Sequence, residues 1–188
     1  MSTIAPDRLW FTEDEEAASL LASDPFALLV GMALDQQVTV QTAFAGPLKI
    51  KQRLGTLDPK AIAEADPERV VEAFREKPAV HRFPGAMAAR VQELAAAIVD
   101  DYDGDAARLW NEARDGDDLR HRLGALPGFG EMKVRTLGAI LAKRFGIPAA
   151  QSLAPAHPTL GDVDSLEALA SYQAAKRAHK AAMREKPS

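Results

Sequence analysis

The sequence predicts an all-α protein, and three observations carry this prediction. Helix-capping residues recur along the 188-residue chain, several of them as Asp-Pro pairs in which aspartate caps a helix and proline occupies its first turn. Between these caps, apolar residues recur at helical spacing. No alternating apolar and polar pattern longer than a few residues indicates a strand.

The expected helices follow one another closely, each opened by a cap. They are a helix after the capping box Thr12 and Glu15, 26–34 after Asp24-Pro25, 39–54 with a bend at Gly46-Pro47, short helices after Asp58-Pro59 and Asp66-Pro67, 86–102, 106–113 after Asp105, 119–123 after Asp117, 131–145, and a last helix from its cap Asp164 to Arg184. Residues 146–161 are rich in proline, glycine and alanine without periodicity, which predicts a functional or mobile loop.

Composition excludes several classes of protein. The chain has no cysteine, which excludes disulfides, thiolate zinc sites and iron–sulfur clusters. No apolar stretch has membrane-spanning length and the first residues lack a secretory signal, so we expect a cytoplasmic protein without a membrane partner. The net charge of −4 is not typical of a nucleic-acid binder, but affinity follows local charge. Basic residues cluster late, although each run can also be a solvated helix face: Lys133, Arg135, Lys143, Arg144, Lys176, Arg177, Lys180 and Arg184.

The most specific feature is a tight bend between two helices, Leu126-Pro127-Gly128-Phe129-Gly130. Two glycines allow positive φ and leave N–H groups uncovered, and the next helix adds its own free N–H groups. This pattern predicts an anion site for a phosphate, or for a monovalent cation that bridges to one. Lys133 and Arg135 are expected to add charged contacts. An ordinary helix-to-helix turn is the alternative, but the full pattern with its basic residues favours DNA.

These residues resemble the helix-hairpin-helix DNA glycosylases, the HhH-GPD base-excision superfamily. The resemblance covers about residues 26–145: Leu126 to Leu141 are similar to the family's hairpin and second helix, 34–40 to its early helix-entry motif, and 81–85 to the segment before the hairpin. It implies one HhH-GPD unit over 1–188 with two helical lobes. These are a barrel-like core of 25–146 with the hairpin in 117–146, and a second lobe from the terminal segments 1–24 and 147–188.

The resemblance also implies site residues. The DNA-binding set is Gly128, Phe129, Gly130, Met132, Lys133 and Arg135, and the wedge that fills the gap of a flipped base is Gln37 with Gln36 beside it. An amide suits this role because it donates and accepts hydrogen bonds. The family's catalytic aspartate is displaced here, because no acid lies between Glu131 and Asp162. Val163-Asp164-Ser165 is similar to the family's sequence at that position, so Asp164 is the first candidate and Asp162 the second. A capping role for Asp164 is compatible with catalysis.

The sequence therefore predicts a monofunctional N-glycosylase that binds duplex DNA with a damaged or mismatched base, flips the base and hydrolyses its glycosidic bond. Lyase activity is disfavoured because Met132 stands where the family has its lysine nucleophile. We expect a monomer, associated with the nucleoid, without metal or other cofactor apart from the hairpin cation. Four histidines show no metal-ligand spacing and are expected at the surface or as caps: His81, His121, His157 and His179.

Two alternatives remain open from the sequence. One is a non-catalytic relative that recognises distorted duplex DNA through the same hairpin, and the other is a helical protein-interaction domain. Five aromatic side chains are expected in the core rather than as a platform for a base, namely Trp10, Trp110, Phe44, Phe74 and Phe83. Among them Phe83, in a loop, is the one to test for stacking on a base.

Overall fold

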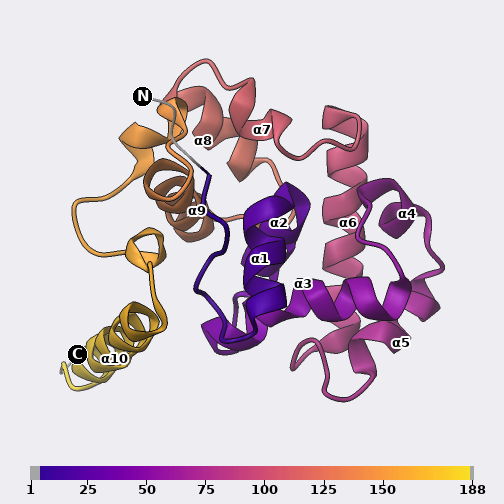
Figure 1. Ribbon diagram of the computed structural model, residues 1–188, viewed down its shortest axis with the longest axis horizontal. Coiled ribbons are helices and arrows are strands. Elements are labelled where there is room, and N and C mark those ends of the chain that lie inside the picture. The colour runs from indigo at the N-terminus through magenta and orange to yellow at the C-terminus, as the bar shows by residue number, and fades with distance from the viewer. Residues whose placement is uncertain (1–4, 187–188) are drawn as a thin grey trace.

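The computed structural model describes residues 5–186, and its helices confirm the all-α prediction (Figure 1). The α-helices are α1 Glu15–Ser23, α2 Pro25–Leu34, α3 Val40–Leu54, α4 Pro59–Glu64, α5 Pro67–Arg75, α6 Pro84–Tyr102, α7 Arg108–Asn111, α8 Gly116–Gly124, α9 Glu131–Lys143 and α10 Leu166–Arg184. Two short 3-10 helices, η1 Pro148–Leu153 and η2 Leu160–Asp162, lie in the segment expected to be a loop. That segment is therefore partly structured and packs on α9.

Several helices begin where the sequence predicts, and four predicted caps are wrong by one to two residues. Helix α7 begins at Arg108 with Ala107 as its N-cap, rather than directly after Asp105. The Asp-Pro pairs open α2, α4 and α5, with each aspartate accepting from an amide of the first turn. The observed caps of α1, α8 and α10 are Asp14 rather than Thr12, Asp115 rather than Asp117, and Ser165 rather than Asp164. In each case a neighbouring side chain accepts from the third amide of the helix, so Asp164 has no capping role.

Helix α2 runs through the middle of the fold, and its nine residues Phe26–Leu34 are all buried. It packs against α3, while α6 packs against α4 and α5 on one flank (Figure 1). Helix α9 packs on η1 and η2 on the other flank. The buried hydrophobic residues of these elements form one continuous core, from Leu9 to Leu169. The division into a central and a terminal lobe stays a prediction.

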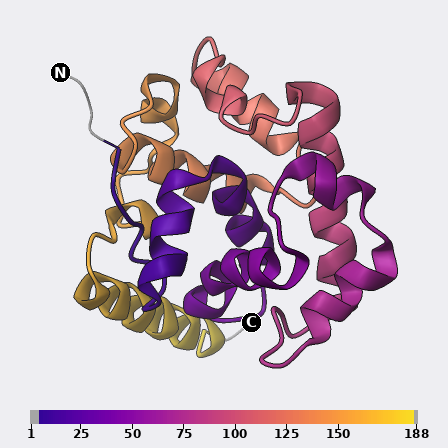
Figure 2. The same cartoon turned by 45° about the vertical axis from the view of Figure 1, so that its right-hand side comes forward.

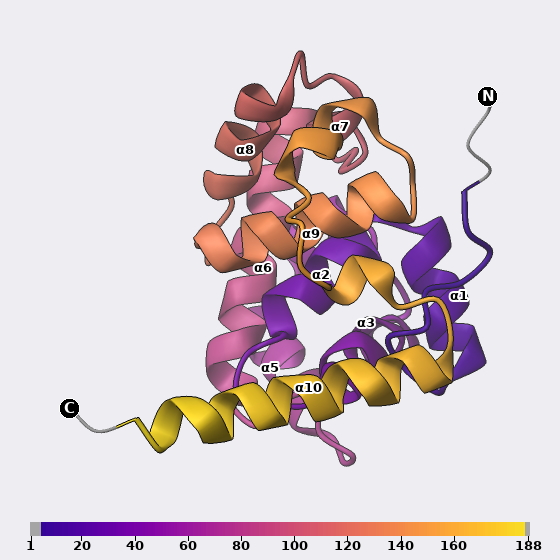
Figure 3. The ribbon, with the colours of Figure 1, turned by 90° about the vertical axis from the view of Figure 1, so that its left-hand side faces the viewer.

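Helix α10 lies along one side of the helical body (Figures 2 and 3). Leu169 is its buried residue, and its second half is exposed and basic. Its first half is tied to α3 by a hydrogen bond of 2.9 Å from Gln41 Nε2 to Gln173 Oε1. The start of α9 and the end of α2 both lie on the side toward which α10 runs (Figure 3). This side carries the candidate site.

The most hydrophobic helix, α2, is buried in the core of the protein. Among residues 5–186, no single helix is long and apolar enough to cross a membrane. Helices α1 and α2 reach that length only together, and the pair is bent by 116°.

Candidate functional site

The hairpin joins α8 to α9, and its two glycines differ in conformation. Gly128 has a φ of +78°, in the left-handed region that glycine adopts without strain. Gly130 has a φ of −80° and a ψ of 179°, so the expectation of positive φ is wrong there. Leu126 and Phe129 are buried and anchor the bend in the core.

The start of α9 leaves its backbone N–H groups open. Gly130 is the N-cap, and no side chain caps this helix. A Cβ built on Gly130 would meet none of the described atoms within 4 Å, so there is open space beside the N-cap residue. Free N–H groups at the positive end of a helix dipole attract an anion. The geometry at Gly130 is therefore suited to a phosphate.

An arginine from α6 completes the positive charge at the hairpin. A Cβ built on Gly128 would overlap Nη1 of Arg90, so this guanidinium lies directly on the glycine. The Arg90 side chain is 38% exposed and forms a long ion pair with Glu93, at 3.6 Å. Gly128 is thus favoured by its φ, and a larger residue there would also displace the Arg90 side chain. Sequence reasoning missed Arg90 because it lies 38 positions before Gly128, in another helix, and no local motif marks it.

The structure turns Lys133 inward, away from the phosphate side. Its Nζ donates to the carbonyl oxygens of Met32 and Ala33, at 2.8 and 2.9 Å. These are carbonyls of the last turn of α2, where the helix dipole favours a cation. Burial lowers the pKa of Lys133 and Arg90 lowers it further, while Asp35 opposes the change. The lysine expected to bind phosphate thus ties α9 to α2.

Two further residues of the predicted DNA-binding set lie on the surface of α9. Met132 is 76% exposed beside the hairpin. Arg135 is exposed and pairs with Glu131 at 2.8 Å, one helical turn earlier. Both side chains are accessible to a partner, although the Arg135 guanidinium already forms an ion pair with the Glu131 carboxylate.

The loop after α2 presents one glutamine and holds the other. Gln37 is exposed with a φ of +57°. Gln36 is held by a contact of 3.6 Å from its Nε2 to Met87 Sδ. His81, expected at the surface or as a cap, is 1% exposed and lies under this loop. Its Nδ1 accepts from Phe83 N–H at 2.9 Å, so its Nε2 carries the proton and donates to the Gln36 carbonyl at 3.0 Å.

The expectation of a core position is wrong for Phe83, because it lies at the N-cap of α6, at the end of a loop. It is 41% exposed, and the guanidinium of Arg82 lies 5.2 Å from its ring centre. Because His81 bonds both the Gln36 carbonyl and the Phe83 amide, the two loops are fixed to each other. An exposed ring and the exposed Gln37 amide are therefore carried by two loops that one buried histidine joins.

Asp35 lies at the junction of these elements and was not singled out by the sequence. It is the C-cap of α2 and is half-buried. Burial raises its pKa, against the effect of three lysines, which are Lys176, Lys133 and Lys180. Tyr172 of α10 is a further neighbour, because burial and the charge of Asp35 both raise the pKa of this phenol. Asp35 thus sits where α2, α9 and α10 meet.

The two aspartates predicted from the sequence lie at the opposite end of α9. Asp162 accepts two hydrogen bonds from Lys143 Nζ, at 2.8 and 2.7 Å, and one from Thr159 N–H at 2.7 Å. Partial burial alone would raise the pKa of Asp162, but the bonds from Lys143 and Thr159 lower it. Asp164 is exposed and lines a cavity of about 430 Å³ with Arg144 and the segment 6–10. Lys143 and Arg144 lie a whole helix length beyond the hairpin, so they are not part of its positive charge.

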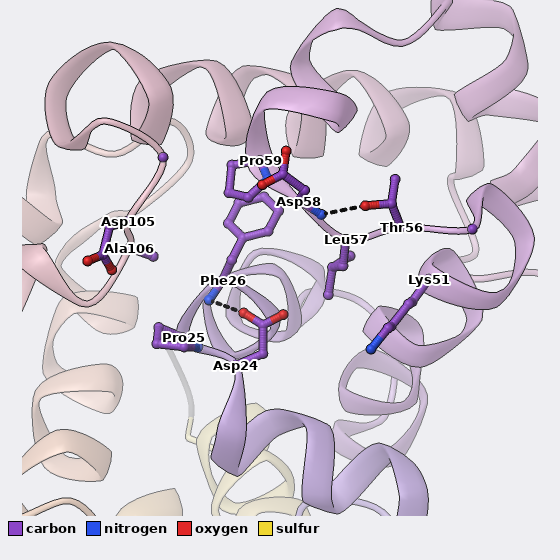
Figure 4. A pocket seen from close by; sticks show the side chains of 12 residues that line it. Asp24, Pro25, Phe26, Lys51, Thr56, Leu57, Asp58, Pro59, Asp105 and Ala106 are labelled. Atoms are coloured by element: carbon purple, nitrogen blue, oxygen red, sulfur yellow. Dashed lines mark hydrogen bonds between the residues drawn. The ribbon is translucent and has the colours of Figure 1, made fainter.

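Another cavity, of about 400 Å³, lies at the start of α2 (Figure 4). Asp35 is at the other end of this helix, as its C-cap. Its acidic lining consists mainly of helix caps. The Asp24 carboxylate accepts from Phe26 N–H at 2.9 Å, and Asp58 caps α4. Figure 4 shows the bond from Phe26 N–H to Asp24 and a second bond from Asp58 N–H to Thr56 Oγ1. The polar groups here serve helix initiation, so we do not place the site in this cavity.

Among residues 5–186, no three His, Asp or Glu side chains gather as a metal site. The monovalent cation expected at the hairpin would be bound by backbone carbonyls, and it stays a prediction.

The hairpin, the uncapped start of α9 and Arg90 together form a site suited to a phosphate in an all-α protein. The chain matches the family described as HhH-GPD superfamily base excision DNA repair protein over residues 30–186, and it belongs to this superfamily. Membership implies DNA binding and base excision repair by a DNA glycosylase. The comparisons with curated proteins and with solved structures found no match.

Proposed function

We propose that the protein is a monofunctional DNA N-glycosylase that acts, as a monomer, on duplex DNA with a damaged or mismatched base. The observation that carries the proposal is the open start of α9, with Gly130 unobstructed and Arg90 lying on Gly128. A phosphate held there places the duplex against the neighbouring loop. Gln37, exposed on that loop, then fills the stack after the target base has been flipped.

The reaction that fits this arrangement is hydrolysis. The bond between the base and C1′ of the sugar breaks, and the base leaves with the bonding electron pair. The sugar passes through an oxocarbenium-like state, which a nearby carboxylate stabilises. A water oxygen then bonds to C1′, and its proton goes to solvent or to the departing base. The products are an abasic site and a free base.

The surroundings of Lys133 support hydrolysis over a lyase reaction. A lyase needs a free amine that attacks C1′. Met132 carries no amine, and the amine of Lys133 is bound to the Met32 and Ala33 carbonyls. The strand should therefore stay intact after base removal.

Labelled duplexes carrying alkylated, oxidised, deaminated or mismatched bases test the proposal. Incubation followed by heating in alkali should cleave the strand at one or more of these bases, whereas incubation alone should not. Cleavage without alkali, together with a borohydride-trapped adduct, would contradict the monofunctional assignment.

A second candidate is a non-catalytic protein that binds distorted duplex DNA. The engagement of Asp162 by Lys143 and Thr159 favours it, because this carboxylate is already used within the protein. Tight, salt-dependent binding to mismatched or abasic duplex, with no abasic product from any base in the panel, would decide for this candidate.

A further inference from the structure

We propose that Asp35, rather than Asp164 or Asp162, is the catalytic carboxylate of the glycosylase reaction proposed above, on which this inference rests. In this role Asp35 lies against the sugar of the flipped nucleotide. Its charge stabilises the positive charge that develops on the sugar as the glycosidic bond breaks. Nothing bonds covalently to Asp35, and water completes the reaction at C1′.

The position of Asp35 relative to the two expected DNA contacts is the first argument. It follows the last residue of α2 and precedes the exposed Gln37 by two positions. The first turn of α9 is fixed to the same helix end, because Lys133 Nζ binds the Met32 and Ala33 carbonyls. In the proposed complex the phosphate of the flipped nucleotide binds the α9 amides, and Gln37 fills the place in the stack that its base has left. The sugar of this nucleotide then lies between these two contacts. Asp35 is the carboxylate at that junction.

The second argument is that the Asp35 carboxylate has no structural task. Within residues 5–186, no N–H or O–H group donates to it and no cation forms an ion pair with it. The end of α2 is closed by the backbone instead, through Asp35 N–H and the Met32 carbonyl at 3.2 Å. Other partly buried aspartates of this chain, such as Asp24, accept amide hydrogen bonds. The hydrogen bonds of the fold therefore do not explain the presence of this half-buried carboxylate.

The third argument is electrostatic. Burial raises the pKa of Asp35, the direction expected for a carboxylate that is partly removed from water. Lys176, Lys133 and Lys180 lie near enough to oppose that shift without pairing with it. In such surroundings a charge acts on its neighbours more strongly than in water. A developing positive charge on a sugar placed here would be stabilised more than at the exposed Asp164.

Single-turnover excision by matched aspartate-to-asparagine variants tests the assignment, on the lesion that the wild-type protein processes fastest. Asp35→Asn should slow excision by at least about 100-fold. The same variant should bind the duplex as tightly as the wild type or more tightly, because it removes a negative charge from a DNA-facing surface. Asp100→Asn is the matched control, since Asp100 is exposed on α6. The rival variants Asp164→Asn and Asp162→Asn should keep most of the excision rate.

The outcomes separate this inference from the function on which it rests. Excision by Asp35→Asn within threefold of the wild type, with loss of excision in Asp164→Asn or Asp162→Asn, overturns the assignment and leaves the glycosylase intact. A wild-type protein that excises no base overturns both. Loss of excision in Asp35→Asn supports the assignment only with a melting temperature no lower than the wild type's. Asp35→Glu, which keeps the charge one methylene further out, should regain part of the rate, and no recovery at all would count against a charge-based role.

Discussion

The two ends of α9 each bring a lysine near an aspartate, and the two pairs are built differently. At the C-terminal end, Lys143 Nζ contacts Asp162 directly, and Asp162 also accepts from Thr159 N–H. At the N-terminal end, Lys133 binds carbonyls of α2, and Asp35 lies nearby without a donor. The pKa of Asp162 is lowered and that of Asp35 is raised.

This difference separates a carboxylate that stabilises the fold from one that the fold only tolerates. Asp162 closes a capping box and pins the segment after α9, so its charge is satisfied within the protein. Asp35 is kept where burial disfavours its charge, and such sites are commonly functional. The same contrast holds for the backbone N–H groups at the starts of two helices. Ser165 caps those of α10, whereas no side chain caps those of α9. The open amides and the Asp35 carboxylate thus lie at the hairpin end, although Nε of Arg144, at the other end of α9, is also buried without a hydrogen-bond partner among the described residues.

The largest effect is expected from obstructing the open amides. Gly130→Ala should weaken binding to abasic duplex by about 10- to 100-fold, the value of one or two charge-assisted hydrogen bonds. Its melting temperature should not fall, because Gly130 has negative φ and its Cβ would meet no described atom. Gly124→Ala is the matched control, since a Cβ there also meets nothing. Equal affinity of the two variants in a fluorescence-anisotropy titration would remove the α9 amides from the DNA interface.

The next effect distinguishes Lys133 from Arg90. Lys133→Met should lower the free energy of unfolding by about 1–3 kcal/mol, because it removes two bonds from a charged donor to α2. The salt dependence of DNA binding should stay unchanged. Arg90→Met should instead lower the slope of log affinity against log salt by about one. Denaturant unfolding and titrations at several salt concentrations measure both quantities, and a reversed pattern would place Lys133 on a phosphate.

A smaller loss of stability is expected at the opposite end of α9. Asp162→Asn should cost about 1 kcal/mol, because it weakens the capping box and the pair with the partly exposed Lys143. A double-mutant cycle with Lys143→Met should give a coupling energy of the same sign. If the two changes are strictly additive, Asp162 and Lys143 do not stabilise each other and the contrast with Asp35 loses its basis.

Most of the fold could be predicted from the sequence, because its signals are local. The Asp-Pro caps of α2, α4 and α5 are contained in adjacent residues. The errors also have a local cause: Asp14, Asp115 and Ser165 compete as caps with acceptors one or two residues away. Which acceptor is used depends on how the preceding chain enters the helix, and the sequence does not specify that path.

The site was predictable only in part, because its members come from separate helices. The hairpin glycines and the exposed Gln37 are marked by a motif, whereas Arg90 and Tyr172 reach the site through the packing of α6 and α10. Lys133 shows the limit of such reasoning, since its helix position indicates charge at the hairpin but not the inward turn of its side chain. One signal could have pointed to Asp35, a charged residue directly after the wholly apolar α2.

The smallest effect is a pH signature of opposite sign for the two carboxylates. The folded-state pKa of Asp35 lies above the ordinary value of 3.8, so the wild type loses stability relative to Asp35→Asn as pH rises through that value. The folded-state pKa of Asp162 lies below it, so the wild type's advantage over Asp162→Asn is complete above 3.8 and is lost as pH falls. Melting temperatures from about pH 3 to about pH 6 should therefore show Asp35→Asn gaining on the wild type by about 1–3 °C and Asp162→Asn falling behind it. A wild type that gains on Asp35→Asn as pH rises would mean that Asp35 is held by a partner in the folded protein, and the proposed division between the two ends of α9 would fail.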